Sequence, residues 1–125
     1  MNSRTVLALD TSVLLSLSAS IAMAQNSPPT YQADPDVYKI IFEDQNFRVI
    51  AATWKQGTTD KPHSHPVPSV VYPLTDCVLR LRNPDGTTRE IPSKTGTAFA
   101  APITQSHTAE NVSGSDCRAI LVERK

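Results

Sequence analysis

Three histidines are the side chains of this chain that are best suited to chemistry, and they fall in two places. His63 and His65 are separated by one residue in the proline-rich stretch KPHSHP, and His107 follows about forty residues later. On an extended backbone, side chains two positions apart point to the same face, so the first two imidazoles can reach one point in space. A third imidazole from a different strand would complete a set of ligands for a metal ion.

Three neutral imidazoles would allow more than one kind of chemistry. Bound Fe(II) would leave room for O2 and a chelating substrate, whereas bound Zn(II) would hold an acidified water and favour hydrolysis. Neutral ligands leave the charge of a 2+ ion uncompensated, which favours an anionic molecule in the open positions. The alternative is that the two nearby histidines are surface residues of a proline-rich loop. The histidines alone leave these alternatives open.

The elements that must position the histidines are predicted to be short β-strands separated by turns. No stretch beyond the first segment keeps an apolar period of 3.6 residues over three turns, and ten prolines, many at strand ends, argue against helices. The sequence NPDG between two such strands is a hairpin signal. We therefore expect an all-β sandwich or barrel of about eight strands, at 38–43, 47–54, 69–74, 77–82, 87–92, 97–102, 106–112 and 117–123.

The spacing around the histidines resembles the two sequence motifs of the cupin family. The first motif begins with a glycine, five further residues and His-x-His, a pattern that Gly57, His63 and His65 match. The second motif places a glycine, a proline, another glycine, a histidine and an asparagine at fixed intervals. It is matched by Gly96, Pro102, His107 and Asn111, with Thr104 where the other glycine is usual.

The resemblance covers nearly all of residues 38–125 and implies a small cupin barrel, a fold also described as a double-stranded β-helix or jelly roll. It implies that His63, His65 and His107 are the metal ligands. It also implies a divalent transition metal as the cofactor, namely Fe, Mn or Zn. Because single cupin barrels commonly pair through a sheet, the resemblance further implies a homodimer.

The chain departs from the family pattern at the glutamate of the first motif. The place of this glutamate falls on Ser69 or Val70, depending on the length of the spacer, and Asp76 stands at the place of the motif's closing glycine. The ligand set implied for this chain is therefore three histidines without a carboxylate. Some cupin-like thiol dioxygenases also manage with three histidines.

The function implied by the resemblance is that of an exported, metal-binding cupin. The first hypothesis is a non-haem, dioxygenase-type oxidoreductase that acts on a small, anionic molecule, with no catalytic residue assigned beyond the three ligands. The second hypothesis is a non-catalytic barrel that binds a small molecule or a metal. A third hypothesis is a structural cupin that holds no metal.

Four other residues carry weaker functional hypotheses. Glu110 could replace the missing carboxylate only if a bulge turned it inward, so we expect it to be a solvated surface acid. Asn111 is expected to tie a loop by hydrogen bonds. Tyr72 could present its hydroxyl to a ligand but is expected in the core, and Trp54 is expected at the barrel rim.

The strand predicted at 77–82 alternates between two kinds of side chain. Cys77, Leu79 and Leu81 share one face, and Arg80 and Arg82 share the other. If the leucines point inward, the arginines face solvent. If the strand is reversed, the arginines form a clamp for an anion.

Two cysteines, Cys77 and Cys117, each open an apolar run. In an exported protein they could form a disulfide. The alternative is two buried thiols on separate strands, and the sequence leaves both states open.

The first part of the chain is predicted to be an export signal followed by a flexible arm. A mostly apolar segment ends in the sequence AMA at residues 22–24, a small-x-small site typical of signal-peptide cleavage. We therefore predict a signal peptide at 1–24, cleaved after Ala24, and a secreted or periplasmic protein without membrane association after processing. Residues 25–37 are rich in proline and polar residues and are predicted to form the arm. The cupin domain is predicted at 38–125.

The composition argues against two classes of partner. Twelve basic and twelve acidic residues give a formal net charge of zero, and these charges are spread singly along the chain. Such a pattern offers no basic patch for nucleic acid or for an anionic membrane surface. The expected partner is a small-molecule ligand or substrate.

Overall fold

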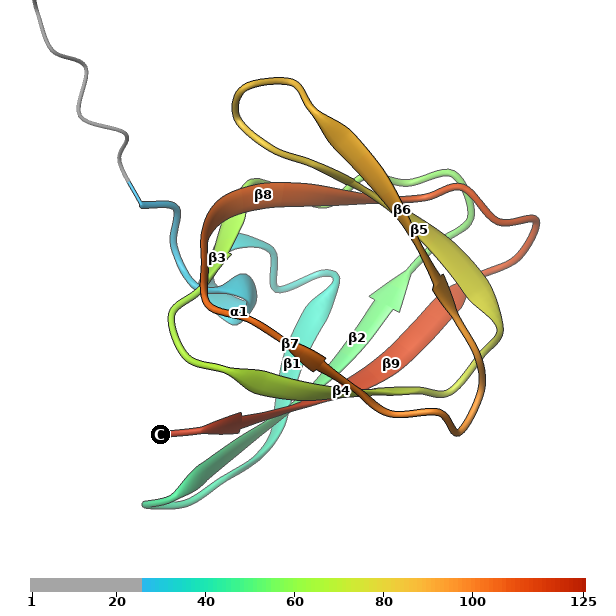
Figure 1. Cartoon of the computed structure of the whole chain (residues 1–125). Helices are drawn as coiled ribbons and strands as arrows, with labels where there is room; N and C mark the ends of the chain where they lie inside the picture. Colours follow the sequence, from blue (N-terminus) through green and yellow to red (C-terminus); the bar gives the residue numbers. More distant parts are fainter. Residues whose placement is uncertain (1–25) are drawn as a thin grey trace, which may run out of the picture.

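The computed structural model describes residues 26–125, which form two antiparallel β-sheets (Figure 1). The five-stranded sheet has the order β1-β2-β9-β4-β7, and the four-stranded sheet has the order β3-β8-β5-β6. Within the described range, no helix is long and apolar enough to span a bilayer. The strands are β1 (Tyr38–Glu43), β2 (Phe47–Trp54), β3 (His63–His65), β4 (Ser69–Pro73), β5 (Cys77–Arg82), β6 (Thr88–Ser93), β7 (Phe99–Ala101), β8 (Thr104–Asn111) and β9 (Cys117–Arg124).

The all-β fold expected from the sequence is confirmed, with one strand more than the pattern indicated. Each of the eight predicted strands overlaps an observed strand. The ninth is β3, whose three residues are bounded by prolines on both sides and therefore show no strand pattern of their own. It forms through pairing with β8, with His63 directly opposite His107.

The segment predicted to be a flexible arm at 25–37 is instead packed against the barrel from residue 27 onward. It contains the short helix α1 (Thr30–Ala33), whose first residue is fully buried. Pro29 bridges to Ser64, and the Ser64 backbone N–H donates to the Pro28 carbonyl at 2.8 Å. The prediction failed because composition does not reveal that this segment covers the otherwise open edge of β3. The predicted signal peptide at 1–24 lies outside the described residues.

The core lies between the two sheets, and two aromatic residues take positions opposite to those expected. Trp54, expected at the rim, is 4% exposed and packs edge-to-face against Tyr38 with ring centroids 5.5 Å apart. Tyr72, expected in the core, is 45% exposed on the outer face of β4 together with Val70. Alternation along a strand tells which residues share a face, but it does not tell which of the two faces is buried.

A disulfide between Cys77 and Cys117 resolves the question left open by the sequence. It joins the first residue of β5 to the first residue of β9, and its Cα atoms are 5.6 Å apart. Because β5 and β9 belong to different sheets, the bridge ties the two layers of the barrel together.

Removing this bridge is expected to destabilise the protein without unfolding it at room temperature. The two cysteines are 40 residues apart in sequence, so the Cys77→Ala/Cys117→Ala variant should lose about 2–4 kcal/mol of unfolding free energy. Urea unfolding of wild type and variant, each with and without reductant, measures this. The reductant should weaken only the wild type; an equal response of both proteins would contradict the bridge.

Candidate metal site

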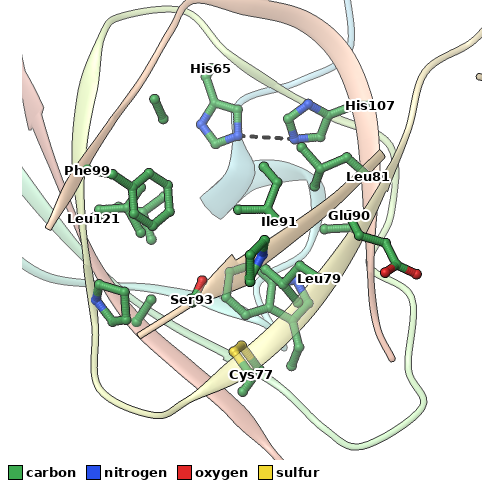
Figure 2. Close-up of a pocket in the computed structure, with 18 of the residues that line it drawn as sticks. His65, Cys77, Leu79, Leu81, Glu90, Ile91, Ser93, Phe99, His107 and Leu121 are labelled. Atoms are coloured by element: carbon green, nitrogen blue, oxygen red, sulfur yellow. Dashed lines mark hydrogen bonds between the residues drawn. A yellow bond between two sulfur atoms is a disulfide. The ribbon is translucent and has the colours of Figure 1, made fainter. Parts of the chain in front are cut away.

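The structure brings the three predicted histidines together inside the barrel. Their ring nitrogens lie within 4.8 Å of one another, and all three residues are buried. His65 Nε2 and His107 Nε2 are 3.3 Å apart, and Figure 2 shows these two rings facing each other at one end of a pocket. The convergence expected from the sequence is therefore present, because β3 carries two of the rings and its partner β8 carries the third.

The backbone around His63 fixes the tautomer of its ring. Its Nδ1 lies 2.9 Å from the Lys61 carbonyl, which can only accept a hydrogen bond, so Nδ1 carries the proton. The lone pair of the neutral ring is then on Nε2. Ligating histidines commonly use the same device, in which the second ring nitrogen donates to a carbonyl or carboxylate.

Asp60 is a buried carboxylate behind the histidines, and the sequence analysis did not identify it. It is 4% exposed and accepts hydrogen bonds from Tyr38 Oη at 2.6 Å, from Trp54 Nε1 at 2.8 Å and from the Ala109 backbone N–H at 2.7 Å. Its Oδ1 is 3.5 Å from His63 Nδ1. The one feature of the sequence that could have indicated its role is its place among the five residues between Gly57 and His63 of the first motif. Its three donors come from β1, β2 and β8, and sequence spacing cannot show such partners.

Burial keeps the rings of His65 and His107 neutral. Burial, with a smaller contribution from the nearby His63, lowers the pKa of His65 from 6.5 to about 4. Burial, the other two histidines and the Arg89 charge lower the pKa of His107 from 6.5 to about 3. Burial and the adjacent Asp60 raise the pKa of Tyr38 well above 10. At pH 7 both imidazoles are therefore uncharged, which is the state that binds a metal.

No carboxylate of the described residues joins the three histidines. Ser69, at the place of the family's glutamate, is buried on β4, and Glu123 lies opposite it on β9. The Glu123 carboxylate instead contacts Arg48 at 3.3 Å. Glu110 is half-buried away from the rings, with its carboxylate 3.6 Å from Arg80, as expected for a surface acid. The centre offers three imidazoles and no acidic ligand.

Asn111 ties a loop, as the sequence predicted. Its side-chain amide donates to the carbonyls of Trp54 at 3.0 Å and Ser115 at 2.8 Å, and its carbonyl oxygen accepts from the Ser113 backbone N–H at 2.9 Å. These bonds join the ends of β2 and β8 to the turn before β9. The residue therefore supports the strand that carries His107 without lying among the ligands.

A cavity of about 390 Å³ opens beside His65 and His107. In Figure 2 the two histidines lie at one end of this pocket and Cys77 lies at the other. Because Leu79 and Leu81 point into it, Arg80 is on the outer face, so of the two arrangements considered for this strand β5 has the one with solvent-facing arginines. The walls are mainly apolar and include Leu79, Leu81, Ile91, Phe99 and Leu121.

The donor set fits a divalent transition metal. Three buried imidazoles with clustered nitrogens suit Fe or Zn better than Mg or Ca, which prefer oxygen ligands. His63, His65 and His107 would hold the ion, and the cavity beside two of them leaves space for a further ligand.

Comparisons with known proteins place the fold. Neither a protein-family model nor a curated protein matches the sequence. Among solved structures, a cupin domain from Bordetella pertussis matches with a TM-score of 0.66 at 20% identity, covering 79% of this chain and 96% of that one. An RmlC-like cupin with a double-stranded β-helix from Methanocaldococcus jannaschii matches with a TM-score of 0.57 at 11% identity, covering 70% and 78%. The polyketide cyclase RemF from Streptomyces resistomycificus matches with a TM-score of 0.52 at 22% identity, covering 70% and 63%.

These matches show that the chain has the cupin fold, the double-stranded β-helix implied by its motifs. At these identities the likeness concerns the fold alone. The chemistry of this chain must be argued from its own site.

Lowering the pH is expected to destabilise the metal-free protein. The folded rings of His65 and His107 take up protons only near pH 4 and pH 3, whereas an unfolded histidine does so near pH 6.5. Between these pH values the unfolded chain binds more protons than the folded chain. The free energy of unfolding should therefore decrease as the pH is lowered, by up to about 1.4 kcal/mol per pH unit for each ring. Urea unfolding of chelator-treated protein at several pH values measures the slope. His107→Gln should reduce it; an unchanged slope would contradict the assignment.

Changing Asp60 is expected to weaken metal binding although it is not a ligand. Asn at this position offers one acceptor oxygen in place of two, so the three donors and the neighbouring His63 ring can no longer all be satisfied. Asp60→Asn should lower zinc affinity about 10- to 100-fold, whereas Tyr38→Phe, which removes one donor, should lower it less. Competition with a chromophoric chelator measures both. Wild-type affinity in a folded Asp60→Asn protein would show that Asp60 does not position the ring.

Proposed function

We propose that this protein is a metal-binding cupin and a metal-dependent oxidoreductase of the dioxygenase type. His63, His65 and His107 hold a divalent ion, Fe, Mn or Zn, and a small molecule binds in the adjoining cavity. The observation that carries the proposal is the convergence of three buried imidazoles on one point at the end of a mainly apolar pocket. When bound at such a centre, iron supplies a site where O2 and an organic substrate can meet.

The residues of this chain make three contributions to such a reaction. The three imidazoles bind the ion without adding negative charge, which leaves it attractive to an anionic group. The apolar walls exclude water from the molecule beside the ion. Tyr38 donates a hydrogen bond to Asp60, which holds its side chain in place as part of the cavity wall.

A second candidate function is a non-catalytic barrel that binds a small molecule or a metal. It is favoured by the lack of a free acid or base at the centre among residues 26–125. Asp60, the buried acid closest to the rings, is held by three donors and does not line the cavity. A structural cupin without metal would require that the three buried imidazoles serve packing alone.

Export and pairing of the protein also remain proposals. Export is supported by the Cys77–Cys117 disulfide, because such bridges persist mainly in oxidising compartments. Pairing is supported by exposed apolar side chains on the outer face of the five-stranded sheet, including Val70 and Tyr72 on β4.

Elemental analysis of protein purified without a histidine tag tests the metal centre. We expect close to one equivalent of a transition metal per chain. His107→Ala should lose it, because only two imidazoles would remain. Glu110→Ala is the matched control on the same strand and should keep the metal, since its carboxylate faces Arg80. Equal loss in both variants would show that the ligand set is wrong, and a metal-free wild type would favour the structural cupin.

A further inference from the structure

The cavity has a cationic side chain at its mouth that the proposed function does not use. In the β5–β6 pair, Leu81 lies opposite Arg89 and Leu79 lies opposite Ile91. Side chains that face each other across two antiparallel strands share a face of the sheet. Because both leucines line the cavity, Arg89 and Ile91 are on the cavity side as well, and both contribute to its wall.

Arg89 has no ion-pair partner among residues 26–125, in contrast to Arg80 on the neighbouring strand. Arg80, on the outer face of β5, contacts Glu90 at 2.9 Å and Glu110 at 3.6 Å. Glu90 is the acidic residue of the cavity rim, so its charge is taken up by Arg80. The guanidinium of Arg89 is exposed and free to bind an anion.

The position of Arg89 along the cavity is at the histidine end. It lies opposite Leu81 in the β5–β6 pair, and Figure 2 shows Leu81 beside His107. Farther from the histidines, the wall consists of Leu79, Ile91 and Phe99, and Figure 2 shows it continuing to Cys77. The cavity is therefore polar and cationic at the histidine end and apolar along most of its length, and Arg118, which follows Cys117, is a second arginine of its wall.

We propose that this cavity binds an amphipathic carboxylate, a small molecule with one acidic group and an apolar, ring-sized body. The acid lies between Arg89 and the histidines, and the body lies against Leu79, Ile91 and Phe99. The inference rests on the proposed function in using the same cavity, but it does not require that a metal is bound. Sugars and short dicarboxylates fit poorly, because their polar groups would be buried against the leucines without hydrogen-bond partners.

Three probes separate the contributions of charge and apolar surface. These are 2-naphthoate, its neutral analogue 2-naphthamide, and malonate, which has charge but no apolar body. Trp54 is the only tryptophan of the chain and lines the cavity, so its fluorescence reports occupancy. The full chain should bind 2-naphthoate about tenfold more tightly than 2-naphthamide, the effect of one charge-assisted hydrogen bond, and malonate more weakly than either.

Two variants and one matched control assign these preferences to residues. Arg89→Gln should weaken 2-naphthoate binding about tenfold and leave 2-naphthamide unchanged. Arg82→Gln, on the outer face of the neighbouring strand, should change neither. Ile91→Asn should weaken both aromatic probes. Thermal unfolding of each variant confirms that it is folded.

The ligand titrations are made on chelator-treated and on metal-loaded protein. Their result can therefore be distinguished from the result of the metal analysis. Preference for 2-naphthoate that is lost in Arg89→Gln supports the inference even in a protein that takes up no metal. Equal binding of the acid and the amide by the wild type, or an unchanged preference in Arg89→Gln, would overturn it. Tighter binding of malonate than of 2-naphthoate would also overturn it, because the apolar wall would then contribute nothing.

Discussion

The antiparallel pairing of β3 with β8 is the constraint on which the site depends. It places His63 directly opposite His107 and brings His65 to the same side. A shift of one residue in this register would turn the rings of one strand to the other face, and the cluster would be lost. Because β3 is only three residues long, its register is held from both sides, by β8 and by the segment at residues 28–29 that covers its free edge.

The polar groups buried with the histidines make this arrangement specific. A carboxylate in a protein interior is costly unless its lone pairs are satisfied, and Asp60 is satisfied by donors from three strands. Those donors include the two aromatic side chains Tyr38 and Trp54, which also form part of the cavity wall. The positions of the rings, the packing of the core and the shape of the pocket are thus set by one network.

The sequence predicted the elements of this fold well because its signals were local. Prolines, turns and alternating apolar residues indicated the strands, and the motif spacing indicated the three histidines. It did not reveal which face of each strand is buried. Trp54 is inside and Tyr72 is outside, because alternation alone does not distinguish the two faces. It also missed the packed segment from residue 27 and the role of Asp60, since both depend on partners far away in the sequence. Arg89 was missed for the same reason, because its place at the cavity follows from the β5–β6 register.

The central claim is that three imidazoles, and no acidic side chain, bind one ion inside the barrel. A crystal structure of cobalt-loaded protein with anomalous data at the cobalt edge tests it most directly. We expect a single strong peak within bonding distance of His63, His65 and His107, with the remaining positions open to the cavity. A peak outside the barrel, or a carboxylate such as Glu123 among the ligands, would contradict it.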